Sequence, residues 1–332
     1  MTKKNLATIS TDTLIVGAGF SGLYLANILL DLGYKSFIIA APDQATVSDK
    51  SYYDFRSRGV RQDSMKSSML KAGKRKSNFQ LVNALVNGID DELTYLNSFA
   101  KLKPSFIGAQ VIDPQGLLLY LKDKTGDCRI YDEVASIEKQ SGHFIGKTAK
   151  QTIISQRIVF CSGGNRAEFS KIFSEEKTRN NIFTIAQRLG CATMMLDKIM
   201  YHPFYSKKGV CLPSDSLADF KVVNGKGQEL KKTNELLQAH NAHHCFDEIL
   251  DEFRKNRSCF AVKDKIKIKL APQPHYRLGG LKIDKRSRTN QKNVYALGEC
   301  ACGMHGLGRI GGCALSEIIV MARVVAQQLV KK

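Results

Sequence analysis

The sequence has no apolar run long enough to cross a lipid bilayer. A membrane-spanning helix needs about 20 consecutive apolar residues, and no segment of the 332-residue chain approaches that length. The first residues, MTKKNLATISTD, contain two lysines but no apolar stretch of the kind found in secretory signals. We therefore expect neither a membrane anchor nor secretion, and the cytoplasm is the expected location.

Internal repeats, low-complexity segments and a regular cysteine spacing are also missing. The nine cysteines are scattered and odd in number, which fits a reducing compartment better than a disulfide framework. With 43% hydrophobic and 24% charged residues, the composition is that of a globular protein rather than a disordered one. The length favours one large domain that carries an insertion, or two domains.

Acidic residues are few compared with basic ones. Lysine and arginine number 50 against 31 for aspartate and glutamate, so the formal net charge is +19. Such a surface attracts nucleic acid, anionic lipid, phosphorylated cofactors and small dicarboxylates alike. A lysine-rich surface without any specific partner explains the charge equally well. Direct nucleic-acid binding is not expected, because no recognition helix, zinc finger or aromatic-stacking motif accompanies the charge.

A strand, a glycine-rich turn and a helix are expected near the amino terminus, where residues 13–39 read TLIVGAGFSGLYLANILLDLGYKSFII. Apolar periodicity predicts a strand over 13–16, a helix to about Leu32 and a second strand over 36–39. Gly33 is expected to cap the helix. This is the strand–helix–strand context in which a GxGxxG motif binds a dinucleotide.

The three glycines of this motif have separate roles in dinucleotide binding. Gly17 permits the tight turn, Gly19 lets the backbone approach a pyrophosphate, and Gly22 lets the helix pack closely on the strand. The helix amino terminus adds N–H groups and the positive end of the helix dipole. A purely structural glycine turn is the alternative.

The acidic residue that usually binds the ribose hydroxyls is absent. Its spacing from Gly17 places it at Ala40. Asp43 lies three residues later, after Pro42, and is the candidate substitute. Without that substitute, dinucleotide binding would be weaker, or the adenosine end would be held differently.

The most specific pattern lies near the carboxyl end, where residues 267–317 read IKLAPQPHYRLGGLKIDKRSRTNQKNVYALGECACGMHGLGRIGGCALSE. On these residues the chain resembles the flavoprotein family of fumarate reductase, succinate dehydrogenase and L-aspartate oxidase. Further pieces match in the order of that family. The matching pieces are Gln62-Asp63-Ser64, IVFCSGG at 158–164, His202-Pro203, Pro274-His275-Tyr276, Gly279-Gly280, Asp284, Val294-Tyr295-Ala296, Gly298-Glu299, His305-Gly306 and Arg309.

The resemblance implies an α/β fold: a Rossmann-like FAD-binding domain with a small inserted α+β capping domain. The expected FAD-binding domain comprises 1–203 and 265–332, and the expected insertion is 204–264. Within the insertion, VVNGKGQELKK predicts a hairpin with a Gly-Lys-Gly turn, followed by a helix. The position that carries a flavin-linked histidine in some relatives falls near Tyr52 or Tyr53, so FAD is expected to be non-covalent.

In this family the glycine-rich loop from Gly298 to Gly312 would wrap the ribityl and isoalloxazine parts of FAD. The helix expected to begin near Ala314 would direct its positive end at the pyrimidine edge of the flavin. A glycine-rich surface loop is the alternative. The residues expected to bind FAD are Gly17, Gly19, Phe20, Ser21, Gly22, Gly59, Ser162, Gly163, Gly298, Glu299, Gly311, Gly312, Ala314 and Leu315.

The resemblance also implies a small dicarboxylate substrate, fumarate/succinate or L-aspartate, that exchanges a hydride with flavin N5. His202, His275 and Arg309 match the carboxylate-binding positions of the family, and arginine suits a carboxylate because it binds bidentately. Each also has an ordinary structural interpretation. His202 could cap a turn, His275 could be a core histidine, and Arg309 could pair with a surface carboxylate.

The chain departs from the family in the capping segment. The family's proton-delivering arginine should fall near residues 237–250, but the chain reads LQAHNAHHCFDEIL there. His240 and His244 are the candidate proton carriers, because histidine titrates near neutral pH. Solvated or packing histidines are the alternative. With Cys245 and Cys259 the cluster suggests a metal site, but its spacing matches no standard zinc arrangement, so no metal is expected.

Two further departures keep other functions open. Gly308 and Cys313-Ala314 replace asparagine and asparagine-serine at family positions, which removes some expected hydrogen bonds. The alternatives are an FAD enzyme of the same fold with another substrate, such as a ring ketone, and a catalytically degenerate flavin-binding protein. Because the chain stops at Lys332, soon after the last expected helix, no iron–sulfur subunit is expected as a partner.

Overall fold

The chain forms two compact units. Unit 1 comprises Met1–Lys198 and Arg277–Lys332, and unit 2 comprises Ile199–Tyr276. The computed structural model describes residues 7–40, 53–56, 62–104, 109–164, 182–202, 204–206, 212, 217–238, 246–255 and 257–331.

Unit 2 is longer than the insertion expected at 204–264. Strand β11 (Ile199–His202) pairs with β15 (Gln273–Arg277). The two segments that flank the insertion are therefore held to each other, and they cluster with it rather than with the FAD-binding part.

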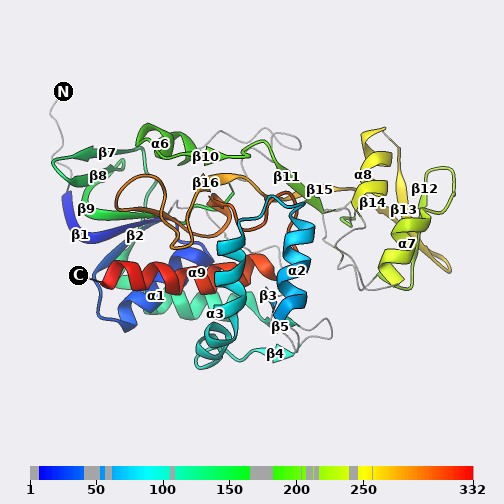
Figure 1. Cartoon of the computed structure of the whole chain (residues 1–332), viewed down its shortest axis with the longest axis horizontal. Helices are drawn as coiled ribbons and strands as arrows, with labels where there is room; N and C mark the ends of the chain where they lie inside the picture. The colour runs from blue at the N-terminus through cyan, green and yellow to red at the C-terminus, as the bar shows by residue number, and fades with distance from the viewer. Residues whose placement is uncertain are drawn as a thin grey trace. The chain divides into compact units, whose positions relative to one another are not determined.

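A seven-stranded sheet forms the centre of the described part of unit 1 (Figure 1). Parallel pairing joins β1 to β2 on one side and to β9 on the other, and β17 also pairs parallel with β9. Its strand order is β6-β2-β1-β9-β8-β7, with β17 attached to β9. The bounds are β1 Ala7–Val16, β2 Ser36–Ala40, β6 Arg129–Tyr131, β7 Ser136–Gln140, β8 His143–Lys147, β9 Gln151–Phe160 and β17 Val294–Ala296.

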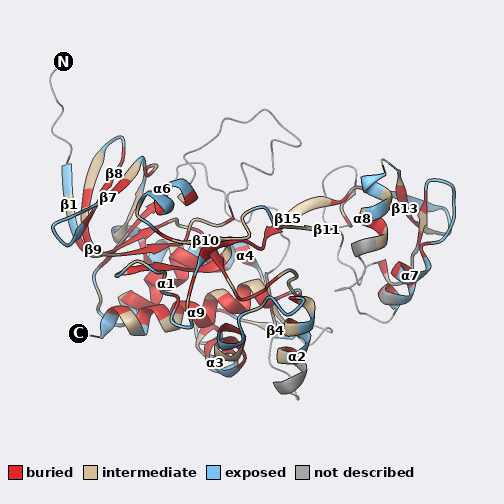
Figure 2. Cartoon of the chain, turned by 45° about the horizontal axis from the view of Figure 1, so that its top comes forward, coloured by how far each residue is buried: buried red, intermediate tan, exposed pale blue. Residues whose placement is uncertain are grey.

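Three helices pack together to form much of the core of unit 1 (Figures 1 and 2). Helix α1 (Phe20–Asp31) contacts α9 (Cys313–Val330), which also contacts α3 (Phe79–Asn97). Every α1 residue from Phe20 to Leu29 is buried. An apolar helix with no polar face is expected in such a position, because it is covered on all sides.

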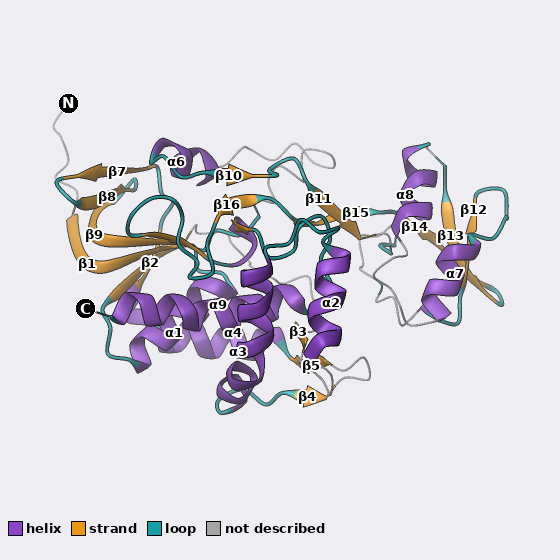
Figure 3. Ribbon diagram, viewed as in Figure 1, coloured by secondary structure: helices purple, strands orange, loops and turns teal. Residues whose placement is uncertain are grey.

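Shorter elements complete unit 1 (Figure 3). Helix α4 begins at Pro114, and the Asp113 carboxylate caps it by accepting hydrogen bonds from Gln115 N and Gly116 N. The remaining elements are α2 Gln62–Ala72, α4 Pro114–Lys124, α6 Ile182–Arg188, β3 Tyr53–Arg56, β4 Lys103–Pro104, β5 Ala109–Ile112, β10 Thr193–Met194, β16 Gly280–Lys282 and β18 Ala301–Cys302.

Helix α9 is long and apolar enough to cross a membrane by length and composition alone. However, 56% of its residues are buried inside the protein. Its contacts with α1 and α3 are those of a core helix.

Unit 2 has its own apolar core, which includes Phe204, Val222, Ile249 and Ala261. Its antiparallel sheet has the order β12-β13-β14, and helices α7 and α8 contact this sheet. The bounds are β12 Lys221–Asn224, α7 Lys231–Gln238, α8 Phe246–Arg254, β13 Cys259–Lys263 and β14 Ile266–Leu270.

The predicted Gly-Lys-Gly hairpin is only partly formed. A single bridge, Val223 to Glu229, joins the two sides of the turn, whereas β12 pairs along its length with β13. The reason is local: Leu230 enters the core and α7 begins at the next residue.

Candidate functional site

Two positions at the turn between β1 and α1 have no room for a side chain. Gly17 has a φ of +113°, and a Cβ there would lie 2.4 Å from the carbonyl oxygen of Cys161. A Cβ on Gly22 would lie 2.0 Å from the carbonyl oxygen of Gly17. Glycine at these two positions lets α1 start directly against the ends of β1 and β9.

The segment after β9 lies beside this turn. Cys161 N donates to Val16 O at 2.8 Å, and the Ser21 hydroxyl donates to Cys161 O at 3.5 Å. Gly163 has a φ of +70°, but none of the described residues lies within 4 Å of the position that its Cβ would take. The buried Ser162 hydroxyl lies beside the Cys300 thiol. Open space therefore adjoins the carboxyl ends of two parallel strands, where α/β sheets bind ligands.

A third segment, which follows β17, reaches the same place. Leu297 N donates to Phe160 O at 2.9 Å. Gly298 has a φ of +76°, and a Cβ there would lie 3.2 Å from the Ser21 side chain. The carboxylate of Glu299 lies so close to Gly164 that a Cβ on that glycine would be 2.2 Å from it.

The structure thus brings together residues expected to bind FAD from three separated segments of unit 1. Gly19 caps α1 with extended backbone, at φ −73° and ψ −178°, so it does not need glycine's left-handed freedom. Gly59 lies outside the described residues. The convergent residues are Gly17, Gly19, Phe20, Ser21, Gly22, Ser162, Gly163, Gly298 and Glu299.

The other expected FAD-binding residues lie at the start of α9. The helix begins at Cys313, one residue before the predicted start, and Gly312 caps it with a φ of +76°. A Cβ on Gly312 would lie 2.9 Å from Arg56 N in β3, and Gly311 is exposed. Ala314 and Leu315 belong to the first turn of α9.

Arg309 precedes this helix start in a loop that contacts α2. Its side chain is half-buried, and Nη1 donates to Ile310 O at 3.2 Å. A Cβ on neighbouring Gly308 would lie 2.4 Å from Ala72 O at the end of α2. The loop is therefore fixed by close backbone contact.

A buried contact between a histidine and a carboxylate connects the same loop to α9. His305 Nε2 lies 2.7 Å from Glu317 Oε2, and the two side chains are 5% and 3% exposed. Sequence comparison matched His305 to the family without assigning it a role. Because it joins the loop to the helix, we infer that the pair holds Arg309 in place relative to α9.

Sequence reasoning missed Arg277, a buried arginine behind the site. Its Nε donates to Gly164 O at 2.8 Å, its Nη1 donates to Leu196 O, and its backbone N donates to Glu299 Oε1 at 2.8 Å. Arg277 is 3% exposed. An arginine within the apolar stretch YRLGGL was the available signal, because a charge there must find partners inside the protein.

His202 and His275 lie together in unit 2, on the paired strands β11 and β15. Their ring centroids are 5.2 Å apart. Tyr205 Oη lies 3.4 Å from His275 Nδ1. His202 Nδ1 accepts from Phe204 N at 3.2 Å, so the neutral ring carries its proton on Nε2. The capping bond considered for His202 therefore exists, and it coexists with the histidine pair.

The histidine-rich capping segment lies outside the described residues, including His240, His244 and Cys245. Cys259 is buried in the core of unit 2, and burial raises the pKa of its thiol to about 11. In the described part of the chain, no three His, Cys, Asp or Glu side chains gather to hold a metal ion.

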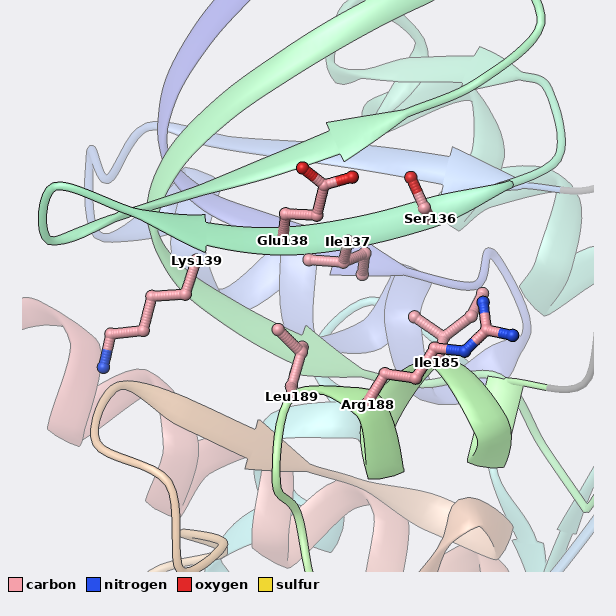
Figure 4. Close-up of a pocket in the computed structure, with 7 residues that line it drawn as sticks. All are labelled: Ser136, Ile137, Glu138, Lys139, Ile185, Arg188 and Leu189. Carbon is pink, nitrogen blue, oxygen red and sulfur yellow. The ribbon is translucent and has the colours of Figure 1, made fainter.

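A separate cavity of about 480 Å³ lies between β7 and α6 (Figure 4). No residue expected to bind cofactor or substrate lines it, so it is distinct from the site described above. Its lining residues are Ser136, Ile137, Glu138, Lys139, Ile185, Arg188 and Leu189.

Comparisons with known proteins agree with this geometry. An FAD binding domain profile matches residues 131–315, more than half of the chain. The chain is 26% identical to an L-aspartate oxidase of Clostridium perfringens, over 94% of this chain and 85% of that protein. It is 41% identical to a fumarate reductase flavoprotein subunit of Haemophilus influenzae, over 18% of this chain and 10% of that protein.

Solved structures show the same fold. Quinol fumarate reductase of Escherichia coli superposes with a TM-score of 0.77 at 17% identity, covering 98% of this chain and 70% of that one. A 3-ketosteroid dehydrogenase of Rhodococcus jostii superposes with a TM-score of 0.70 at 11% identity, covering 98% and 97%. At these identities the likeness concerns the fold alone.

The described residues fit a bound FAD. Two glycines leave no room for side chains where strand and helix meet, and Gly163 faces open space beside them. The profile match and the curated relatives point to the same cofactor. The chain therefore binds FAD and belongs to the flavoprotein family of fumarate reductase, succinate dehydrogenase and L-aspartate oxidase.

Proposed function

We propose that this FAD-dependent oxidoreductase acts on a small dicarboxylate, fumarate/succinate or L-aspartate. The observation that carries the proposal is the pair of imidazoles 5.2 Å apart on adjacent strands of unit 2. The L-aspartate oxidase relative, aligned over most of the chain, supports this substrate class. Bound FAD would supply hydride transfer to or from a substrate carbon.

The proposed role of His202 and His275 is to donate hydrogen bonds to substrate carboxylate oxygens. The bond from Phe204 N fixes Nδ1 of His202 as an acceptor, so Nε2 is the donor in the neutral ring. The Tyr205 hydroxyl, 3.4 Å from His275 Nδ1, restricts the second ring.

Arg309, which belongs to unit 1, is proposed to bind a carboxylate of the substrate. A guanidinium forms two parallel hydrogen bonds with a carboxylate, and such charge-assisted bonds are stronger than neutral ones. Its half-buried position strengthens them further, because partial exclusion of water lowers the local dielectric constant.

The convergent glycines and serines of unit 1 are proposed to hold FAD without a covalent bond. Glu299, fixed by the bond from Arg277 N, would accept from FAD hydroxyl groups. His240 or His244 is proposed to carry the proton that accompanies hydride transfer. The proposed location of the protein is the cytoplasm.

Titration of the FAD-loaded protein with fumarate, succinate and oxaloacetate tests the substrate class. We expect a saturable change in flavin absorbance, and at least about tenfold weaker binding in Arg309→Ala. The expected loss follows from the roughly 1.5–3 kcal/mol that a hydrogen bond to a charged group contributes. Arg286→Ala is the matched control, because this exposed arginine lies on a turn of the same unit.

An unchanged flavin spectrum at saturating dicarboxylate would contradict the proposal. If another organic substrate reduced or reoxidised the bound FAD, the function would be that of an oxidoreductase of the same fold with another substrate. If FAD were bound but exchanged electrons with no organic substrate tested, the chain would be a degenerate flavin-binding protein.

A further inference from the structure

Four cationic side chains are exposed where α2 ends. Lys71, Lys74, Arg75 and Lys76, which we call the basic turn, lie within six residues. No aspartate or glutamate occurs between residues 64 and 89. Among the residues that the structure describes, none of the four forms an ion pair. The basic turn is therefore a compact region of positive charge with which no carboxylate of the described residues forms an ion pair.

The basic turn is packed against the loop that precedes α9. Asn78 N donates to Gly303 O at 2.7 Å, and Leu307 N donates to Gly73 O at 3.1 Å. A Cβ on Gly306 would lie 2.5 Å from Gly73 O. In Figure 1 the connection between α2 and α3 lies beside the orange loop that precedes α9. The exposed charges thus adjoin the segment that carries His305 and Arg309.

The backbone of the turn holds two long basic side chains in a costly conformation. Lys74 has a φ of 49° and Arg75 a φ of 61°. The left-handed region is unfavourable for a residue with a Cβ, and glycine would avoid that cost. Lysine and arginine at these positions are therefore not the choice that stability alone would favour, and this points to a use for their charges.

We propose that the basic turn is the docking surface for a small acidic electron-carrier protein that exchanges electrons with the bound FAD. The proposal rests on the redox function of the family. Reduction of one substrate molecule takes two electrons and two protons. Two one-electron carriers are oxidised per turnover, the protons come from solvent, and the opposite direction reverses each transfer.

Charge and size favour an electron carrier over a stable subunit. Transient redox encounters bury less than about 1,200 Å² and are guided by complementary charge. A basic turn of six residues suits such a small contact. A carrier held there would also adjoin the loop of the FAD site.

The test uses the FAD-loaded full chain and a reduced, strongly acidic flavodoxin as the probe, without oxygen. The variant Lys74→Glu/Arg75→Glu/Lys76→Glu lowers the net charge by six. The control Lys226→Glu/Lys265→Glu/Lys269→Glu lowers it equally, at exposed lysines of unit 2. Flavodoxin affinity is measured directly, and stopped-flow absorbance follows electron transfer to FAD, at low and at high salt.

In the turn variant we expect at least a tenfold loss of affinity and of the second-order rate constant at low salt, since electrostatic steering changes such rates by about 10–1,000-fold. The control should lose less than about threefold. Reduction of FAD by dithionite, which needs no docking, should be unchanged in both variants.

Equal losses in the two variants would overturn the proposal, because net charge rather than the turn would then matter. So would the absence of salt-sensitive flavodoxin binding by the unaltered protein. Turn-dependent binding of anionic vesicles or single-stranded DNA without flavodoxin binding would assign another occupant and overturn it too. The dicarboxylate titration is independent, so failure of the substrate proposal would be recognised separately.

Discussion

At the residue scale, glycines near the FAD site are required for two different physical reasons. Gly22 needs to be small, because a Cβ would meet the Gly17 carbonyl at 2.0 Å. Gly163 instead needs its left-handed backbone, at φ +70°, and has open space beside it. A methyl group at Gly163 would therefore strain the backbone but would clash only with a ligand that fills the space.

Gly163→Ala should separate FAD binding from stability. We expect the free energy of unfolding of the FAD-free protein to fall by about 1–2 kcal/mol, the cost of left-handed backbone for alanine. FAD affinity should fall by about tenfold or more, because the methyl group would occupy ligand space. Isothermal titration with FAD and chemical denaturation measure the two effects.

Gly142→Ala is the matched control for this substitution. Gly142 lies in the turn between β7 and β8 with a φ of +83° and nothing within 4 Å. The Gly142→Ala variant should lose a similar free energy of unfolding, but its affinity for FAD should equal that of the unaltered protein. Equal affinities in the two variants would show that FAD does not reach Gly163.

Gly17 and Gly22 could be predicted from sequence because local spacing sets the backbone they require. Arg277 could not. Its partners are backbone carbonyls of Gly164 and Leu196, which are far away in the sequence and carry no recognisable side-chain pattern. A fixed sequence spacing therefore predicts the residues that form a turn. It does not predict residues such as Arg277, which bind backbone groups from a distant part of the sequence.

At the element scale, a buried ion pair joins α3 to α9. Arg323 Nε donates to Glu92 Oε1 at 2.7 Å, and Tyr24 Oη of α1 lies 3.5 Å from Oε2. Burial raises the pKa of the Glu92 carboxyl above its usual range, even though Arg323 acts to lower it. The pair therefore positions α9 against two helices at a cost in desolvation.

Arg323→Met should destabilise the protein by about 2–3 kcal/mol, because Glu92 would be left buried without its cation. The effect is reduced by the 25% exposure of the Arg323 side chain. Adding Glu92→Gln should recover about 1–2 kcal/mol, since the buried charge is removed while an acceptor for Tyr24 remains. Urea denaturation of the two variants, with Glu92→Gln alone as control, measures this coupling.

The loss of stability in Arg323→Met should increase as the pH rises. A carboxyl whose pKa is raised by folding contributes stability that is complete below its unfolded pKa, near 4.5, and is lost as pH rises through the folded pKa. Without Arg323 the folded pKa rises further. The deficit of Arg323→Met should therefore be small below about pH 4.5 and should grow towards neutral pH. A constant deficit across this range would show that Glu92 is not the cause.

The element boundaries show where sequence patterns are insufficient. Apolar residues predicted a strand over 13–16, but β1 begins at Ala7. The additional residues, ATISTD, are mostly polar and partly exposed, and they are held by parallel pairing with β9 from Gln151. Pairing with a distant strand can thus extend an element beyond its own apolar signal.

At the scale of the whole molecule, the residues expected to bind FAD and those that form the apolar core of unit 2 lie in different parts of the chain. The converging residues that are expected to bind FAD belong to unit 1, whereas unit 2 has a separate core. The sequence predicted an inserted unit because the family pattern is interrupted there. Its limits could not be predicted, since they depend on the pairing of β11 with β15.

Hydrogen exchange should show that FAD stabilises one unit selectively. At free FAD one hundred times its dissociation constant, amides of β1 and β9 that exchange by unfolding of unit 1 should gain about 2.7 kcal/mol of protection. Amides of β12 and β13 should be unchanged. Equal gains in both units would mean that the chain unfolds as a single cooperative body.

The discontinuity of unit 1 has a consequence for biosynthesis. The ribosome releases Ile199–Tyr276 as one continuous piece, whereas β17 and α9, which complete the sheet and cover α1, are translated afterwards. We expect unit 2 of the nascent chain to fold while the apolar surface of α1 is not yet covered by α9. A pause in translation before Arg277 would prolong that interval and increase the demand for chaperones.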